Sequence, residues 1–257
     1  MNWRPGIESV RAITGHAIRS LDSAIMPRCC VFCGVELECR ERFYCRPCYA
    51  DMPWNDPQCG RCASPVPLQL SLGIDCASCQ QRPPPFSAGF APLRYAFPVD
   101  AALKAMKFSR RLDYAPAFGA LFTAMSSALP GDIDALLPVP LHWRRHASRG
   151  FNQAVEICRP LQRQTGLPML TGFYRIRPTP YQSGLSAGDR VRNLHAAFES
   201  RHSPAVRHVL IIDDVITTGE TCRQLAAAVL AAGTARVSVL AVARAGPERP
   251  LYTGLNA

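Results

Sequence analysis

The stretch that decides the fold is Val209-Leu210-Ile211-Ile212-Asp213-Asp214-Val215-Ile216-Thr217-Thr218-Gly219-Glu220-Thr221. Its leading apolar residues predict a buried strand over Val206–Ile212 that ends in two adjacent acids. A short Thr-Thr-Gly turn then opens a predicted helix over Glu220–Ala232, which Gly233 stops. A strand, a tight turn and a helix in this order predict one unit of an α/β sheet.

The turn in this stretch has the properties of a phosphate site. Free backbone N–H groups at the start of a helix attract anions, and Gly219 lets the backbone approach a phosphate closely. The hydroxyl groups of the two threonines add hydrogen-bond donors. Beside the turn, Asp213 and Asp214 can accept hydrogen bonds from a vicinal diol. A phosphate next to paired hydroxyls describes a ribose 5-phosphate, bound at the carboxyl end of a strand.

Strand and helix patterns alternate along the second part of the chain. Predicted strands are Gly89–Phe97, Ile133–Pro140 and Arg236–Ala243, and predicted helices are Ala101–Phe108, Tyr114–Ala128 and Asn152–Gln164. Pro160 is expected to kink the last helix or to end its first half. The alternation predicts a mostly parallel sheet with helices on both faces.

Ten of the twelve cysteines lie between Cys29 and Cys79. Eight of these form four Cys-x-x-Cys pairs: Cys30/Cys33, Cys45/Cys48, Cys59/Cys62 and Cys76/Cys79. One such turn presents two thiolates to an ion, and a second turn about 10–20 residues further on completes a tetrahedral site. Because thiolates are soft ligands, the pattern predicts two structural zinc ions in a double zinc ribbon.

The spacing leaves the pairing of the four turns open. In the simplest arrangement the first two turns hold one ion and the last two hold the other, but a crossed arrangement also fits. Cys29 could replace Cys30 through a wider Cys-x-x-x-Cys spacing, whereas Cys39 has no partner and is expected to be incidental. Four thiolate ligands leave no open coordination position, so either arrangement predicts structural zinc.

Composition divides the chain into four segments. Residues 1–28 carry apolar side chains at three- and four-residue steps, which predict an amphipathic helix docked on the protein's own body rather than on a membrane. Residues 29–82 hold the zinc ribbon, residues 83–88 form a stiff linker with three consecutive prolines, and residues 89–250 form the α/β domain. The domain boundary is therefore expected in the linker.

The basic excess lies in the second part of the chain. The formal net charge is +10, of which residues 1–88 contribute +1 (9 basic, 8 acidic) and residues 89–257 contribute +9 (20 basic, 11 acidic). A polyanionic partner would meet the second part first, although a merely basic surface explains the charge equally well. No apolar run approaches the ~20 residues of a transmembrane helix, and no signal-peptide core is present. We expect a cytoplasmic protein with reduced cysteines and no membrane insertion.

The residues Val209–Thr221 resemble, position by position, the 5-phosphoribosyl-1-pyrophosphate (PRPP) motif of type I phosphoribosyltransferases. In that family the acidic pair holds the ribose 2′- and 3′-hydroxyls, which implies this role for Asp213 and Asp214. The turn holds the 5-phosphate, which implies this role for Thr217, Thr218, Gly219, Glu220 and Thr221. The resemblance implies a type I phosphoribosyltransferase-like parallel sheet with flanking helices, preceded by the double zinc ribbon.

Further motifs are similar to one family in particular, the ComF (competence protein F, or GntX-like) family. They are the four cysteine turns, Leu136–Leu141, Arg149–Gln153, and Gln182, Arg190 and Asn193 ahead of the PRPP motif. The likeness runs from about Cys30 to Arg244. It implies PRPP and Mg²⁺ as ligands, and a role in natural transformation and DNA uptake.

In type I phosphoribosyltransferases a loop after the neighbouring strand binds pyrophosphate, and a flexible hood closes over the substrate. The resemblance places this loop at Pro140, Leu141 and His142, with Arg149 following, and places Arg190 in a hood over Arg175–Asn193. The protein would position the reactants and neutralise the leaving group, with Mg²⁺ on the pyrophosphate. No single catalytic acid or base can be identified from the sequence.

Four other polar residues are expected to be structural. Lys104 and Lys107 match a basic element of the family, but a solvated helix face is the favoured interpretation. Cys158 and Cys222 lie within predicted helices and are interpreted as packed thiols.

Three functions remain open at this point. The chain could be a Mg²⁺-dependent phosphoribosyltransferase with an unknown acceptor, or a module that binds single-stranded DNA during uptake. It could also be a PRPP sensor whose zinc ribbon passes the ligand state to a protein of the competence machinery. Aromatic residues make up only 8% of the chain, and no regular aromatic–basic interleaving indicates a base-stacking platform.

Overall fold

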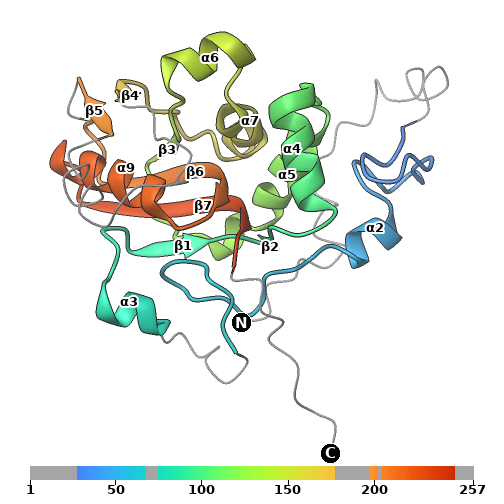
Figure 1. Ribbon diagram of the computed structural model, residues 1–257, viewed down its shortest axis with the longest axis horizontal. Helices are drawn as coiled ribbons and strands as arrows, with labels where there is room; N and C mark the ends of the chain where they lie inside the picture. The colour runs from blue at the N-terminus through green and yellow to red at the C-terminus, as the bar shows by residue number, and fades with distance from the viewer. Residues whose placement is uncertain (1–27, 68–74, 177–196, 202–203, 247–257) are drawn as a thin grey trace, which may run out of the picture.

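The computed structural model describes residues 28–67, 75–176, 197–201 and 204–246. Figure 1 shows a sheet in the middle of these residues with helices on both sides. The helix expected over residues 1–28 lies outside the described residues, apart from its last position. The four domain boundaries stay predictions.

Five parallel strands form the central sheet, in the order β1-β7-β6-β3 with β2 also paired to β7. They are β1 (Ala88–Phe90), β2 (Leu93–Arg94), β3 (Ala135–Pro138), β6 (His208–Ile216) and β7 (Arg236–Arg244). All five run parallel, as expected for strands joined by helical crossovers. The predicted fold class, a parallel sheet with flanking helices, is confirmed.

Alternate residues of each strand pack on opposite faces of the sheet. Leu210 and Ile212 face three helices, α4 (Val99–Ser109), α5 (Tyr114–Ala124) and α7 (Gln153–Thr165). On the other face, Val209 and Ile211 pack with α9 (Glu220–Ala231) and with the antiparallel pair β4 (Phe173–Arg175) and β5 (Phe198–Ser200). Because both faces are covered, the central strands are continuous apolar runs rather than alternating ones.

Several strands differ from their predicted lengths, and β3 is Ala135–Pro138 where the sequence predicts Ile133–Pro140. The strand predicted over Gly89–Phe97 is divided into β1 and β2, because Pro92 lies between them and has no N–H to donate. The strand predicted to end at Ile212 continues to Ile216, because β7 offers a partner along that whole length. The two acids therefore lie within the strand and not after it.

The helices also differ from the prediction, and the one predicted over Tyr114–Ala128 ends at Ala124. The helix α7 continues through Pro160, so the expectation that this residue ends its first half is wrong. A Cβ on Gly119 of α5 would lie 2.8 Å from the carbonyl oxygen of Ile157 and would meet the Pro160 ring. Because Gly119 has no side chain, the backbone of α5 packs directly on the Pro160 ring, and this contact supports α7 at its proline. A further helix, α6 (Trp143–Arg149), has no buried residue and hence no apolar periodicity that could predict it.

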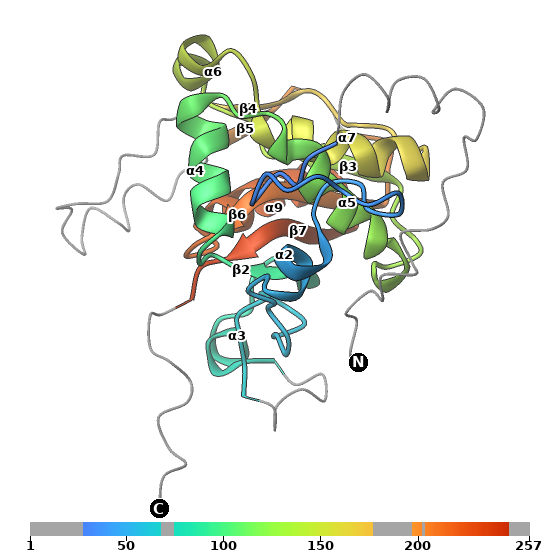
Figure 2. The ribbon, with the colours of Figure 1, turned by 90° about the vertical axis from the view of Figure 1, so that its right-hand side faces the viewer.

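The cysteine-rich part packs against the α/β domain and contains two short helices, α2 (Arg46–Ala50) and α3 (Ala77–Gln81). Figure 2 shows this part, in blue and cyan, beside α5 and beneath β2. The rings of Phe32 and Phe118 lie 6.4 Å apart, and the Gly89 N–H donates to the Gly60 carbonyl at 3.0 Å. A Cβ on Gly89 would lie 2.6 Å from the Arg61 carbonyl oxygen, so only glycine allows this approach.

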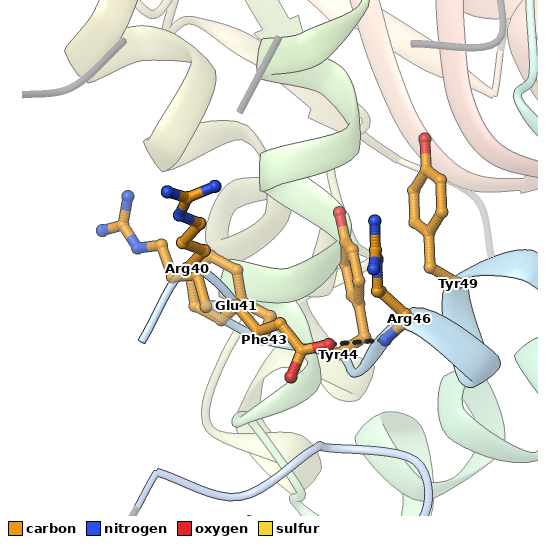
Figure 3. A pocket seen from close by; sticks show the side chains of 7 residues that line it. Arg40, Glu41, Phe43, Tyr44, Arg46 and Tyr49 are labelled. Carbon is orange, nitrogen blue, oxygen red and sulfur yellow. Dashed lines mark hydrogen bonds between the residues drawn. The ribbon is translucent and has the colours of Figure 1, made fainter. Parts of the chain in front are cut away.

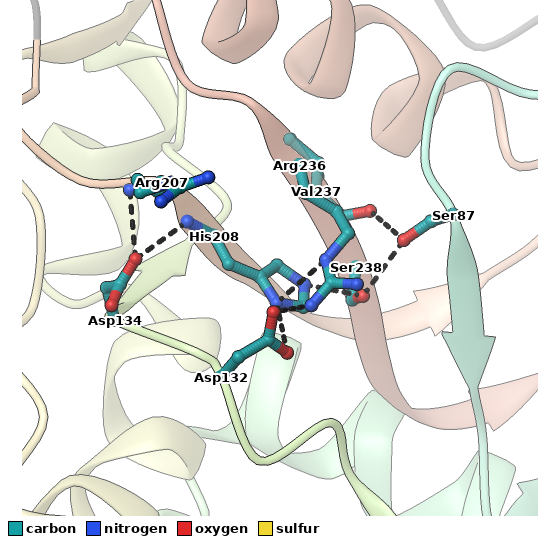
Figure 4. A network of polar contacts seen from close by, with 8 residues as sticks. All are labelled: Ser87, Asp132, Asp134, Arg207, His208, Arg236, Val237 and Ser238. Atoms are coloured by element: carbon teal, nitrogen blue, oxygen red, sulfur yellow. Dashed lines mark hydrogen bonds and ion pairs between the residues drawn. The ribbon is translucent and has the colours of Figure 1, made fainter.

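A polar network with a buried centre joins β6 and β7 at their amino ends (Figure 4). His208 is 2% exposed, with Nε2 at 2.9 Å from Ser238 Oγ and Nδ1 at 3.1 Å from Asp132 Oδ1. Arg236 pairs with the same Asp132 carboxylate. Burial lowers the pKa of His208, against the opposing charge of Asp134. Asp132, His208 and Ser238 are connected in the same order as the acid, base and nucleophile of a hydrolytic triad. However, Ser238 is fully buried, so no substrate can reach it. The network is therefore structural.

The contact between α5 and α7 leads to a stability prediction. We expect Gly119→Ala to lower the free energy of unfolding by about 1–3 kcal/mol, because the added methyl group overpacks the contact with α7. Since alanine is the better helix former, helix propensity alone would raise the free energy of unfolding by about 1 kcal/mol. Gly131→Ala is the control, since a Cβ there has no atom within 4 Å. Urea unfolding of both variants with zinc present measures the difference; equal stability would contradict the contact.

Candidate functional site: an acidic pair and a glycine turn at the end of β6

The site is built around Asp213 and Asp214, which are each 9% exposed near the carboxyl end of β6. The Asp214 N–H donates to Asp213 Oδ1 at 2.8 Å. Burial raises the pKa of Asp213 well above its ordinary value, and the charge of Asp214 adds to the rise. Buried carboxylates need cations or hydrogen-bond donors as partners. The pair is therefore ready to receive donors from a bound ligand.

Lys107 of α4 reaches across to this pair and forms an ion pair with Asp214. Its side chain is 25% exposed. Burial on its own would lower the pKa of Lys107, but the charge and hydrogen bond of Asp214 raise it above its ordinary value. The interpretation of Lys107 as a solvated surface residue is wrong. Lys104, one turn away, does lie on the exposed side and pairs with Asp100 at 2.8 Å.

The turn after the acids leads directly into α9. Thr217 and Thr218 are exposed, and Gly219 has φ +80°, a conformation that L side chains rarely adopt. The N–H of Glu220 donates to Thr218 Oγ1 at 3.3 Å. Glu220 and Thr221, which the resemblance also assigns to the turn, are half-buried at the start of the helix. Exposed hydroxyls at a helix amino end form a surface suited to an anion.

Arg244, the last residue of β7, holds the turn from behind. Its guanidinium donates to the carbonyl oxygens of Ile216, at 2.9 Å, and of Thr217. The other Nη donates to Ser64 Oγ at 2.9 Å, and Ser64 lies 3.3 Å from Cys62 Sγ. Arg244 thus connects the turn with the second group of cysteines. The register that places Arg244 opposite Ile216 could not be derived from spacing.

The loop proposed for pyrophosphate lies at the end of the adjacent strand. Pro138 pairs with Ile212, which places the end of β3 next to the acids. His142, 5% exposed, begins α6, and its Nδ1 accepts the Arg144 N–H at 3.4 Å. Asn152 Nδ2 donates to the Val139 carbonyl at 2.9 Å, so the loop is held at both ends. Pro140 and Leu141 between them are half-buried.

Two arginines complete the surroundings of the acids. Burial lowers the pKa of Arg149 in α6, and the charge of Asp214 opposes that fall. Burial lowers the pKa of Arg175 in β4 in the same way, with the charge of Asp213 opposing it. Cations from α4, α6 and β4 therefore surround one acidic pair. Arg190, the other arginine that the sequence indicated, lies outside the described residues.

The two cysteines of the α/β domain are packed thiols, as interpreted from the sequence. Cys158 and Cys222 are both buried, at 0% and 1% exposure. Burial raises the pKa of Cys158 to about 12 and raises that of Cys222 as well. Neither thiol is activated for nucleophilic chemistry at neutral pH.

The eight knuckle cysteines form two compact groups. They are Cys30, Cys33, Cys45 and Cys48, and Cys59, Cys62, Cys76 and Cys79, with the sulfur atoms of each group within 4.8 Å of one another. Cys33 and Cys45 Sγ lie 3.7 Å apart, and Cys62 and Cys76 Sγ lie 3.6 Å apart. A tetrahedron with Zn–S distances of about 2.3 Å has edges of about 3.8 Å, so both groups fit a zinc ion. The grouping is the sequential one. Cys29 and Cys39 belong to neither group.

The described elements define a parallel α/β protein with two four-cysteine modules. The chain is 33% identical over 231 residues to DNA utilization protein YhgH of Shigella flexneri and of Escherichia coli (strain K12), covering 85% of this chain and 98% of each relative. It is 30% identical over 229 residues to Competence protein F of Haemophilus influenzae, covering 84% and 96%. The chain therefore belongs to the ComF (competence protein F) family.

Among solved structures, a purine phosphoribosyltransferase from Pyrococcus horikoshii is 16% identical, with 55% of this chain and 92% of that chain covered and a TM-score of 0.28. No protein-family model matches the chain. None of the helices in the described ranges has the length and apolar character needed to span a membrane.

The Lys107 ion pair leads to a pH-dependent prediction. Lys107→Met should lower the free energy of unfolding by about 1–3 kcal/mol at neutral pH, because the acids lose their cation. The raised pKa of Asp213 means that its protonated form is favoured in the fold, so the loss shrinks as pH falls and this carboxyl group gains its proton.

The matched control is Lys104→Met, which breaks an exposed pair on the same helix and should cost at most about 0.5 kcal/mol at any pH. Denaturant unfolding at neutral and mildly acidic pH measures both variants. Equal losses for the two lysines would show that Lys107 is an ordinary surface residue.

The sequential grouping of the cysteines predicts separate metal sites. We expect Cys62→Ser to release one zinc ion per chain while the ion of Cys30, Cys33, Cys45 and Cys48 remains. Cys39→Ser, outside both groups, should retain two ions. Elemental analysis of the purified proteins gives the counts, and loss of both ions from Cys62→Ser would point to a shared or crossed arrangement.

Proposed function

We propose that this chain is a phosphoribosyltransferase-like protein that binds PRPP with Mg²⁺ at the carboxyl end of β6. The observation that carries the proposal is the buried acidic pair followed by the exposed threonines, the left-handed Gly219 and the start of α9. The acids accept hydrogen bonds from the ribose hydroxyls, and the turn binds the 5-phosphate. Membership of the ComF family supports the same assignment.

The proposed reaction transfers the phosphoribosyl group to an acceptor nucleophile. The C1–O bond to pyrophosphate breaks, a bond from C1 to the acceptor forms, and pyrophosphate leaves with the electron pair of the broken bond. Pro140, Leu141 and His142 would hold the pyrophosphate together with Arg149, and Arg190 would reach it from the hood. Mg²⁺, a hard cation, would neutralise pyrophosphate oxygens. No acid or base is assigned, because positioning and charge neutralisation carry the chemistry.

Lys107 explains how the site is stable without a ligand. Two adjacent buried carboxylates repel one another, and Lys107 supplies the missing positive charge. Once the ribose hydroxyls donate to the acids, the lysine is free to turn toward a phosphate oxygen. We propose Lys107 as a positioning residue of the site.

The second candidate function is an accessory role in DNA uptake, in which the protein handles single-stranded DNA or senses PRPP for a partner of the competence machinery. Relatives named DNA utilization protein and Competence protein F favour this role. The Arg244 contacts favour sensing, because they join the phosphate turn to Ser64 beside a zinc ligand. We place the protein in the cytoplasm, where thiols stay reduced for two structural zinc ions.

Calorimetry with PRPP and Mg²⁺ tests the proposed site. Wild-type protein should bind, and Asp213→Asn with Asp214→Asn should bind roughly 100-fold more weakly or worse, because two charge-assisted hydrogen bonds to ribose are lost. Asp100→Asn removes a carboxylate that pairs only at the surface of α4 and should leave affinity unchanged.

Circular dichroism and zinc content show whether the double variant is folded. Wild-type protein that fails to bind PRPP would refute the proposed site and would leave the DNA-handling role as the better candidate. Binding by wild type justifies a screen of nucleobases, ammonia and amines for pyrophosphate release.

A further inference from the structure

Apart from Arg149 at its end, the exposed helix α6 has no role in the proposed ribose-phosphate site. None of its residues is buried, and Trp143 is 66% exposed, which is rare for so large an aromatic side chain. Figure 1 shows α6 standing away from the sheet at the top of the molecule. Tryptophan side chains are enriched where proteins contact partners, so the exposed Trp143 is a candidate contact residue.

The tryptophan is stacked with an arginine, Arg144, and further arginines follow it in α6. The guanidinium of Arg144 lies over the Trp143 ring, 5.2 Å from its centroid. Residues 142–152 contain three arginines and no acidic residue. In the described part of the structure Arg144 has no carboxylate within ion-pair distance. The surface of α6 therefore combines an aromatic ring with unneutralised positive charge.

The carboxyl end of α4 lies against α6. Arg110 Nη2 donates to the Ser148 carbonyl at 3.4 Å, and Figure 2 shows the end of α4 beside α6. Phe108, two residues earlier, is 76% exposed. We call Phe108, Arg110, Trp143 and Arg144 the α6 surface. Its two aromatic side chains come from separate segments, so the sequence showed no interleaved pattern.

A second place with arginines and aromatic rings is the hollow on the first cysteine module (Figure 3), with a volume of about 50 Å³. There Arg42 lies 5.0 Å from the Phe43 centroid. However, the hollow also contains Glu41, and its Tyr44 ring is stacked on Tyr49 at 5.4 Å. The faces of these two tyrosine rings are thus already in contact with each other rather than open to a ligand. The hollow serves as an internal control for the α6 surface.

We propose that the α6 surface binds single-stranded DNA. A base stacks on Trp143, a second base contacts Phe108, and the guanidinium groups of Arg144 and Arg110 bind phosphates. A single strand fits and a duplex does not, because only unpaired bases offer their faces to an aromatic ring. The proposal rests on the DNA-handling role proposed above. It places the strand beside the ribose-phosphate site, since Arg149 at the other end of α6 approaches Asp214.

The experiment measures the anisotropy of a labelled oligothymidine with full-length, zinc-loaded protein at low and moderate salt. Trp143→Ala should weaken binding about 10-fold or more, because base–aromatic stacking is lost, whereas Trp143→Phe should restore most of it. Arg144→Gln should weaken binding and reduce its salt dependence. Arg42→Gln, which removes the same charge from another ring-stacked arginine, should leave affinity unchanged.

The outcomes separate this inference from the roles on which it rests. Wild-type protein that does not bind the oligonucleotide at low salt refutes the DNA-handling role and the α6 surface together. Wild-type binding that survives Trp143→Ala, or that falls equally with Arg42→Gln and Arg144→Gln, overturns the α6 surface alone. Equal affinity for duplex DNA of the same length would also overturn it. PRPP calorimetry on Trp143→Ala should be unchanged, whatever the DNA result.

Discussion

The parallel pairing of β6 with β7 is the interaction on which both ends of the molecule depend. Its register places His208 and Arg236 together at the amino end and Asp213 and Arg244 near the carboxyl end. A slip of one residue would turn the apolar faces of both strands over and would separate the acids from the arginine that supports their turn. The polar network at one end and the candidate site at the other therefore use the same ladder.

The register places two carboxyl groups, Asp213 and Asp214, in a buried position where their ionised forms cost free energy. The raised pKa of Asp213 expresses this cost, and the cations of α4, α6 and β4 offset it. A site whose charges are already in place before a ligand arrives needs little reorganisation on binding. The same cations also give the surroundings of the site their positive potential, which favours polyanions.

The cysteine modules contribute by their position as well as by their metal. Each has only a few buried residues, so metal ligation has to supply much of its folding free energy. The first module packs Phe32 on α5, and the second contacts the turn after β6 through Ser64 and Arg244. A change in the second module would therefore reach the turn through Ser64 and Arg244, although the turn lies in another part of the chain.

The sequence by itself determined the features that depend on local spacing. The four Cys-x-x-Cys turns, the strand–turn–helix around Gly219, the parallel α/β class and the family resemblance all follow from residues close together in the chain. The tertiary structure, by contrast, sets which of two neighbouring lysines meets an acid, that Pro160 rests on Gly119, and that Arg110 at the end of α4 meets Ser148 of α6. These contacts join residues distant in sequence, and helix crossing and strand register, which no local pattern encodes, set them.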